Sequence, residues 1–133
     1  MMKKLLALSL VCFSLHAMAQ TPAAKKPFFD SKSYQVFLDT SKCVEGDVEC
    51  DGIVYHSINK KNHHQLTLKG STLNIGPSHD FRGYIFRNGD YSYVLSPAAG
   101  AGNDDNHVWT LQVSQHQSKG DKVLFSENGN VVE

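Results

Sequence analysis

The sequence predicts an all-β protein, a small antiparallel meander of about seven to nine short strands that forms a barrel or a sandwich and carries one disulfide. Three observations predict this class. Apolar and polar residues alternate along several short segments, turn-forming dipeptides separate these segments, and no window of about twelve residues has a capped helical stripe. The length of 133 residues suits a single domain, and the seven Phe and five Tyr exclude a chain that is disordered throughout.

The N-terminal segment, residues 1–19, has the pattern of a cleaved export signal. Two lysines precede an apolar run over residues 5–15, and small residues permit cleavage between Ala19 and Gln20. That run is shorter than the roughly 20 residues that span a bilayer, although a membrane anchor, a buried N-terminal helix and lipidation at Cys12 are alternatives. No second apolar run of membrane length follows. The mature chain is therefore expected in the periplasm or outside the cell, without stable membrane insertion.

Signal cleavage would leave two cysteines, Cys43 and Cys50. Two cysteines in an oxidising compartment usually pair. A closed loop of about eight residues would stabilise the fold by about 2.5 kcal/mol in the chain-entropy model. The spacing does not suit a redox motif, which needs two intervening residues, and no second cysteine pair is present for a zinc site. We therefore predict a structural disulfide.

The mature chain divides into a leader and a β domain. Residues 20–33 contain two prolines and little periodicity, and they predict a flexible leader whose Phe28 and Phe29 can tuck onto the domain. Residues 34–133 are expected to form a single β domain. Alternation over residues 34–39 and 53–58 predicts its first strands.

Two dipeptides predict tight hairpins. Gly70-Ser71 suits a type II′ turn, which would place the apolar residues on either side of it on one face. Asn88-Gly89 suits a type I′ turn and would pair Arg87 with Asp90.

The second hairpin would collect aromatic rings. Phe86 would lie opposite Tyr91, and Tyr84 opposite Tyr93, so that four rings share one face. This face is expected to be core. If it were partly exposed, it would be a binding surface rich in the residues that dominate protein interfaces.

The C-terminal third continues the meander. Residues 96–106 have no periodicity and predict a mobile surface loop. Alternation over residues 108–113 and the apolar run at 122–125 predict two further strands, and Asn128-Gly129 is a weaker turn signal.

The composition and motifs do not point to catalysis or to nucleic acid. Lys+Arg and Asp+Glu balance at 13 each, and the basic residues are too scattered for a nucleic-acid footprint. Ser78, His79 and Asp80 are consecutive, whereas a catalytic triad is built from side chains that converge from separate elements. Asp104 and Asp105 lie in the expected mobile loop, a poor place to hold a shifted pKa. We predict a protein without enzymatic activity and without a cofactor.

Metal binding is the weaker interpretation of two other patterns. Residues 47–51 place oxygen ligands at alternate positions before a glycine, as in the first half of a calcium loop, but Ile58 occupies the position of the closing glutamate. The six histidines of the mature chain lack the spacing of a catalytic zinc site. We predict no metal site, with a polar turn and solvated histidines instead.

The hairpin at residues 83–90, followed by Tyr93 and Val94, resembles one hairpin of the membrane-bound or periplasmic inhibitors of c-type lysozyme. That family consists of small, exported, disulfide-containing β-barrels. Its Ser-Gly-x-x-Tyr loop, which inserts into the lysozyme cleft, has no match here, and the cysteine spacing differs. The resemblance therefore implies an exported barrel that binds a protein, and no inhibitory residue is carried over. The sequence also resembles uncharacterised exported proteins of enteric-type bacteria.

The leading hypothesis is a periplasmic binding protein that inhibits or neutralises another protein, such as a cell-wall hydrolase or a toxin. A loop or an aromatic face would occlude the cleft of the target, as in an immunity protein or a lysozyme inhibitor. The alternative is a periplasmic protein that binds a metal or a small ligand. The candidate binding residues come from two segments, 79–84 and 96–107: His79, Asp80, Arg82, Tyr84, Asp104 and Asp105.

Overall fold

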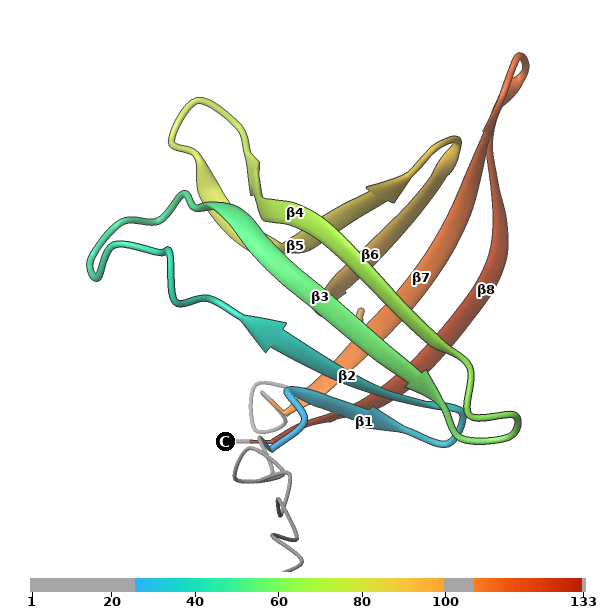
Figure 1. Ribbon diagram of the computed structural model, residues 1–133. Helices are drawn as coiled ribbons and strands as arrows, with labels where there is room; N and C mark the ends of the chain where they lie inside the picture. The colour runs from blue at the N-terminus through green and yellow to red at the C-terminus, as the bar shows by residue number, and fades with distance from the viewer. Residues whose placement is uncertain (1–25, 100–106, 133) are drawn as a thin grey trace, which may run out of the picture.

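A computed structural model describes residues 26–99 and 107–132, which form eight antiparallel strands closed into a barrel (Figure 1). Each strand pairs with the next along the chain, and the last pairs with the first. The strands are β1 (Phe29–Ser31), β2 (Tyr34–Asp39), β3 (Asp51–Asn59), β4 (Gln65–Ile75), β5 (Asp80–Asn88), β6 (Tyr91–Pro97), β7 (Val108–Gln117) and β8 (Gly120–Val131). The all-β prediction is confirmed, and of its two architectures the barrel is the one that forms.

The barrel begins earlier than the sequence pattern indicated. β1 lies inside the segment expected to be a leader, and Phe29 is fully buried. Phe29 pairs with Val36 on one side and with Val131 on the other. A three-residue strand is too short to show alternation, yet it is the strand that closes the sheet. Of the expected leader, residues 20–25 lie outside the described residues.

The predicted hairpin at Gly70-Ser71 is wrong, because β4 runs through both residues without a break. Gly70 is required for close packing instead of for a turn. A Cβ atom there would lie 2.1 Å from the carbonyl oxygen of Ile85 and 2.5 Å from the ring of Phe86. Gly70 is therefore required because the backbone and the Phe86 ring of the neighbouring strand β5 approach it closely, and not because a turn forms there.

Gly129 is a second glycine that is required for close packing within a strand and not for a turn. The Asn128-Gly129 turn does not form, and Gly129 lies within β8, where a Cβ atom would be 2.7 Å from the ring of Phe29. The missing side chain makes room for the aromatic ring that closes the barrel.

The predicted hairpin between β5 and β6 is confirmed, with its register moved by two residues. Gly89 and Asp90 are the central residues, and Phe86 pairs with Tyr93 in place of Tyr91. A shift of two residues keeps every side chain on its expected face, so the aromatic residues still lie together. Arg87 donates a hydrogen bond to the hydroxyl of Ser92 at 3.4 Å and not to Asp90.

The core is the interior of the barrel, and every strand contributes alternate side chains to it. The expected core role of the aromatic face is confirmed for Phe86, which is fully buried, while Tyr84 and Tyr93 are partly buried against the core. The buried apolar residues are Phe29, Val36, Ile53, Tyr55, Leu68, Phe86, Leu95 and Leu111.

The strand connections divide the barrel into two ends (Figure 1). One end carries the connections at residues 40–50 and 76–79 and the described ends of the connection between β6 and β7, Ala98 and His107, and we call it the loop end. The other carries the connections at residues 32–33, 60–64, 89–90 and 118–119, and we call it the hairpin end.

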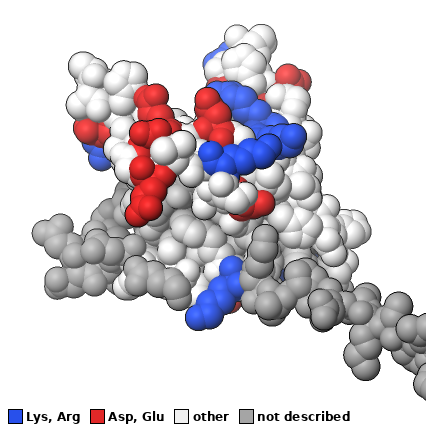
Figure 2. Space-filling view, turned by 60° about the vertical axis from the view of Figure 1, so that its left-hand side comes forward, with Lys and Arg blue, Asp and Glu red and all other residues white. Residues whose placement is uncertain are grey.

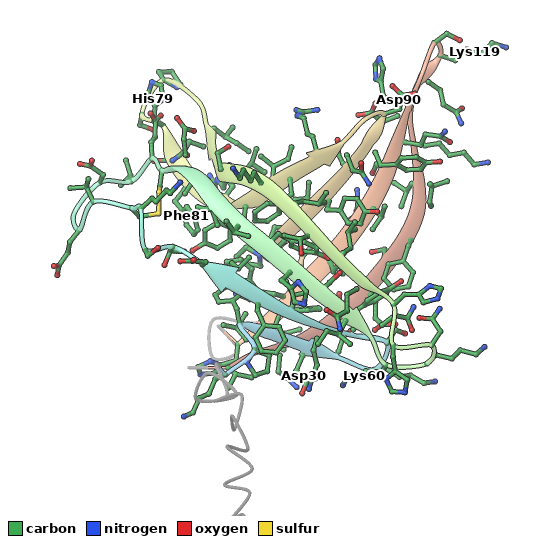
Figure 3. The ribbon with its side chains drawn as sticks, viewed as in Figure 1. Asp30, Lys60, His79, Phe81, Asp90 and Lys119 are labelled. Atoms are coloured by element: carbon green, nitrogen blue, oxygen red, sulfur yellow. A yellow bond between two sulfur atoms is a disulfide. The ribbon has the colours of Figure 1, made fainter. Side chains whose placement is uncertain are left out.

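The hairpin end is fixed by polar contacts between its connections. Lys60 forms an ion pair with Asp30 and donates a hydrogen bond to the carbonyl of Ser31 (Figure 3). The side-chain oxygen of Asn59 accepts a hydrogen bond from the backbone N–H of Lys61 at 2.9 Å, which shapes the turn into β4.

Candidate functional site

The disulfide between Cys43 and Cys50 is confirmed, with their Cα atoms 5.4 Å apart. It closes the connection of residues 40–50 between β2 and β3, so this loop projects from the loop end as a constrained ring. The loop leads directly into β3. A backbone hydrogen bond of 2.9 Å from Thr72 to the carbonyl of Cys50 joins its end to β4.

Asn74 fastens this disulfide loop to the neighbouring connection. Its side-chain amide donates hydrogen bonds of 2.9 Å to the carbonyls of Val48 and of His79, and its oxygen accepts one of 2.7 Å from the Thr72 hydroxyl. A single asparagine therefore holds residues 40–50 and residues 76–79 in one arrangement. The amide thus donates to one carbonyl in each loop, and this ties the two loops to the same strand end.

His79 and Glu49 form a second link between the two loops. The Nδ1 atom of His79 lies 2.5 Å from a carboxylate oxygen of Glu49, and both side chains are more than half exposed. His79 also has a positive φ of 52°, an unusual conformation for a residue with a side chain. The tight 76–79 turn therefore presents the imidazole to the disulfide loop (Figure 3).

An open groove of about 840 Å³ lies between the two loops. Its lining includes three carboxylates, Asp47, Glu49 and Asp51, together with His79 and Asn74. Figure 2 shows acidic side chains gathered in this part of the surface, next to a group of Lys and Arg side chains. The groove wall formed by the disulfide loop is therefore acidic.

Apolar side chains are exposed beside these carboxylates. Val44 and Val48 of the disulfide loop are 65% and 59% exposed, and Ile75 and Phe81 at the base of the next loop are 52% and 42% exposed. Large apolar side chains that gather at one place on a surface mark interaction sites, whereas scattered ones do not. The loop end thus combines negative charge with apolar contact area.

A β-bulge places Phe81 at this surface. The register of β4 and β5 shifts between Leu73 and Asn74, and Gly83 at the bulge has a φ of 131°. In a regular strand, residues three apart point to opposite faces. Here the bulge brings the rings of Phe81 and Tyr84 into edge-to-face contact, with centroids 5.3 Å apart. Phe81 lies within the predicted binding segment 79–84 but was not among its candidate residues, and Gly83 is the sequence signal of the bulge.

The predicted binding residues are only partly brought together. His79 and Asp80 lie at the loop end, and Arg82 is exposed on β5 just beyond them. Tyr84 points into the barrel, where its ring stacks on Trp109 and where burial raises its pKa. Tyr84 is therefore partly buried by packing, and it also lines an open pocket at the loop end together with Val48 and Phe81.

Asp104 and Asp105 lie outside the described residues. The ends of the connection that carries them, Ala98 and His107, are placed at the loop end.

The other proposed chemistries have little support in residues 26–99 and 107–132. These residues contain no group of three or more His, Cys, Asp or Glu side chains that could hold a metal ion. His79 and His116 bind carboxylates at opposite ends of the barrel, and His56 contacts the hydroxyl of Thr67. In this same part of the chain, no helix is long and apolar enough to cross a bilayer.

Comparison of the chain with protein-family models, with curated proteins and with solved structures finds no match.

Proposed function

We propose that this chain is an exported, non-enzymatic binding protein that uses its loop end to contact and inhibit another protein. The supporting observation is that exposed carboxylates and exposed apolar side chains share one surface, which a disulfide and the Asn74 hydrogen bonds hold in place. A surface that is ordered before binding loses less conformational entropy when it binds, so more of the contact energy contributes to affinity.

The charge of the loop end suggests the kind of partner. Residues 40–51 carry four acidic side chains and only one basic side chain, so a partner with a basic surface would be attracted and oriented by them. Cell-wall hydrolases act on anionic polymers, and a basic surface around the cleft favours that substrate. We propose a lysozyme-like or other cell-wall-degrading enzyme, or a toxin of similar charge, as the target.

Inhibition would occur by occlusion and without chemistry. The projecting disulfide loop would enter or cover the cleft of the target, with Val44 and Val48 as apolar contacts and the carboxylates facing the basic rim. The proposed place of action is the periplasm or the space outside the cell, which is also where the disulfide would form.

An inhibition assay tests this function. The mature protein is titrated into c-type lysozyme, and into hydrolases retained from a periplasmic extract, while lysis of cell-wall suspensions is followed by turbidity. We expect stoichiometric inhibition of at least one such enzyme. The absence both of inhibition and of a retained hydrolase would contradict the proposal.

A pair of charge-reversal variants locates the contact. Asp47→Lys/Glu49→Lys changes the loop end, and Asp90→Lys/Asp121→Lys makes the same change in net charge at the hairpin end (Figure 3). We expect inhibition to weaken by about tenfold or more in the first variant and by less than about twofold in the second. Equal weakening would show that net charge matters and the loop end does not.

A further inference from the structure

A second cavity, separate from the groove at the loop end, lies inside the barrel. It has a volume of about 300 Å³, and its lining includes Tyr55 of β3 and Leu111 of β7. β3 and β7 are not neighbours in the sheet, so a space that touches both must lie within the barrel. The cavity is also lined by Asn62 and His64, so it opens at the hairpin end.

The barrel interior is filled on the side of the loop end. Phe28, Tyr84 and Trp109 pack together there, with ring centroids of Phe28 5.6 Å from Tyr84 and 5.4 Å from Trp109. A molecule that entered the cavity would therefore reach the middle of the barrel and stop. The barrel offers a site with one entrance, at the end opposite to the proposed protein contact.

The cavity has one polar wall and one apolar wall. The polar wall comes from β2 and β3, with the hydroxyls of Tyr34 and Ser57 and the amide of Asn59, which donates a 3.4 Å hydrogen bond to Tyr34. The apolar wall comes from β7 and β8 and consists of Leu111, Val113 and Phe125. Such a space suits a ligand with a hydrogen-bonding edge and an apolar face.

Apart from the imidazole of His64 at its entrance, no described side chain that lines the cavity offers a full charge to a ligand near pH 7. Its lining residues in the described part of the chain include no Asp, Glu, Lys or Arg. Burial raises the pKa of Tyr55 to about 12 and also raises that of Tyr93, so both phenols stay neutral near pH 7. The nearest acid on the inner face of β8, Glu127, accepts hydrogen bonds of 2.8 and 2.7 Å from the backbone N–H and hydroxyl of Ser33.

We propose that this barrel cavity is a binding site for one small, uncharged, amphipathic ring compound. The ring would lie against Phe125 and Val113, and a hydroxyl, amine or carbonyl group would bond to Tyr34, Ser57 or Asn59. A volume of about 300 Å³ is at the lower end for ligand pockets, which limits the occupant to one or two fused rings with a substituent. A charged group would lose its hydration without gaining a partner.

Two fluorescent probes that differ by one charged group test the site. N-phenyl-1-naphthylamine is uncharged, and 8-anilinonaphthalene-1-sulfonate is the same molecule with a sulfonate. We expect the uncharged probe to bind the mature protein saturably, with one molecule per chain and about tenfold or more tighter than the sulfonate. Equal affinity for the two probes, or no saturable binding of the uncharged one, would overturn the proposal.

A filled cavity gives the matched control. Val113→Trp places a large side chain in the cavity, whereas Gln112→Trp places it on the outer face of the same strand, because neighbouring residues point to opposite faces. Binding of the uncharged probe should fall about tenfold or more in the first variant and stay within about twofold in the second. If circular dichroism shows that the Val113→Trp variant does not fold, the smaller Val113→Phe substitution is used in its place. Unchanged binding in the folded cavity variant would overturn the proposal.

The loop-end variant Asp47→Lys/Glu49→Lys separates the two sites. It should bind the uncharged probe as the wild type does, because the disulfide loop is not part of the cavity lining. Loss of probe binding in this variant would contradict a cavity that is independent of the loop end.

Discussion

The disulfide connection of the loop end, residues 40–50, carries exposed acidic and apolar side chains, whereas the connection at residues 60–64 of the hairpin end lies at the entrance to a cavity. Both ends are fixed, but by different means. A disulfide and the amide of Asn74 hold the loop end, and an ion pair between Lys60 and Asp30 holds connections at the hairpin end. The comparison suggests that one scaffold separates a protein-contact surface from a small-molecule site. The strands between the two ends carry the stability.

The largest effect is expected where strand β5 approaches the backbone of Gly70 most closely. Gly70→Ala should lower the free energy of unfolding by about 3 kcal/mol or more, because its Cβ would lie 2.1 Å from the backbone oxygen of Ile85. Gly46→Ala in the disulfide loop is the control. Its Cβ would meet nothing within 4 Å, so only its positive φ of 91° opposes the change, at a cost of about 1 kcal/mol.

Urea unfolding of the two glycine variants measures the difference. A Gly70→Ala variant that is no less stable than Gly46→Ala would contradict the view that the wall is rigid and the loop tolerant.

High pH should destabilise the barrel through Tyr55. Its folded-state pKa of about 12 lies above the ordinary value of 10.0, because burial disfavours the phenolate more than the Ser57 hydrogen bond favours it. The resulting stability is fully present below pH 10 and is lost as pH rises through 12, by about 2–3 kcal/mol. Tyr55→Phe should flatten this part of the stability profile. If the free energy of unfolding falls in parallel for the wild type and the Tyr55→Phe variant from pH 9 to 12, Tyr55 is not the cause of the loss of stability.

Removal of the disulfide should affect the two ends unequally. Cys43→Ala/Cys50→Ala should lower the free energy of unfolding by about 2.5 kcal/mol, because the unfolded chain without the disulfide has more conformational entropy. It should also weaken inhibition of the proposed target, because the loop is no longer constrained. Binding of the uncharged probe at the hairpin end should be unchanged in the folded variant. Guanidinium unfolding measures the stability, the lysis assay measures inhibition, and probe titration measures binding in the cavity. Undiminished inhibition by the disulfide-free variant would show that the disulfide does not prepare the loop for binding.

The smallest expected effect concerns Asn74. Asn74→Ala removes the hydrogen bonds to the carbonyls of Val48 and His79 and should cost about 1 kcal/mol. Its clearer signature is faster hydrogen exchange in residues 47–50, which would move independently of residues 76–79. Asn128→Ala is the matched control, because Asn128 accepts one exposed hydrogen bond from Thr110 on the barrel wall. Equal exchange in residues 47–50 of both variants would contradict the role given to Asn74.

The sequence predicted the parts of this fold that depend on local patterns. Alternation predicted most strands, the cysteine pair predicted the disulfide, and the Asn88-Gly89 signal predicted a hairpin within two residues of the observed register. Glycine was misleading at positions 70 and 129, because close approach of a distant strand requires glycine just as a turn does. Local sequence cannot distinguish these two causes.

The candidate sites were predicted less well, for a physical reason. Tyr84 was predicted both as part of a core aromatic face and as a binding residue. The bulge at Gly83 exposes Phe81, while the ring of Tyr84 is partly buried and stacks on Trp109. The cavity could not be predicted from the sequence, because its walls come from strands that are distant in sequence and meet only when the barrel closes. Asn74 was not noticed because an asparagine at a strand end is ordinary until its partners are known.

The most direct test of the proposed loop-end contact is a hydrogen-exchange footprint of the protein bound to a hydrolase that it is found to inhibit. We expect protection of residues 40–51 and 74–81 at the loop end, with exchange at residues 60–64 and 118–119 of the hairpin end unchanged. Protection confined to the hairpin end, or an inhibited complex with no protection of the disulfide loop, would contradict this contact.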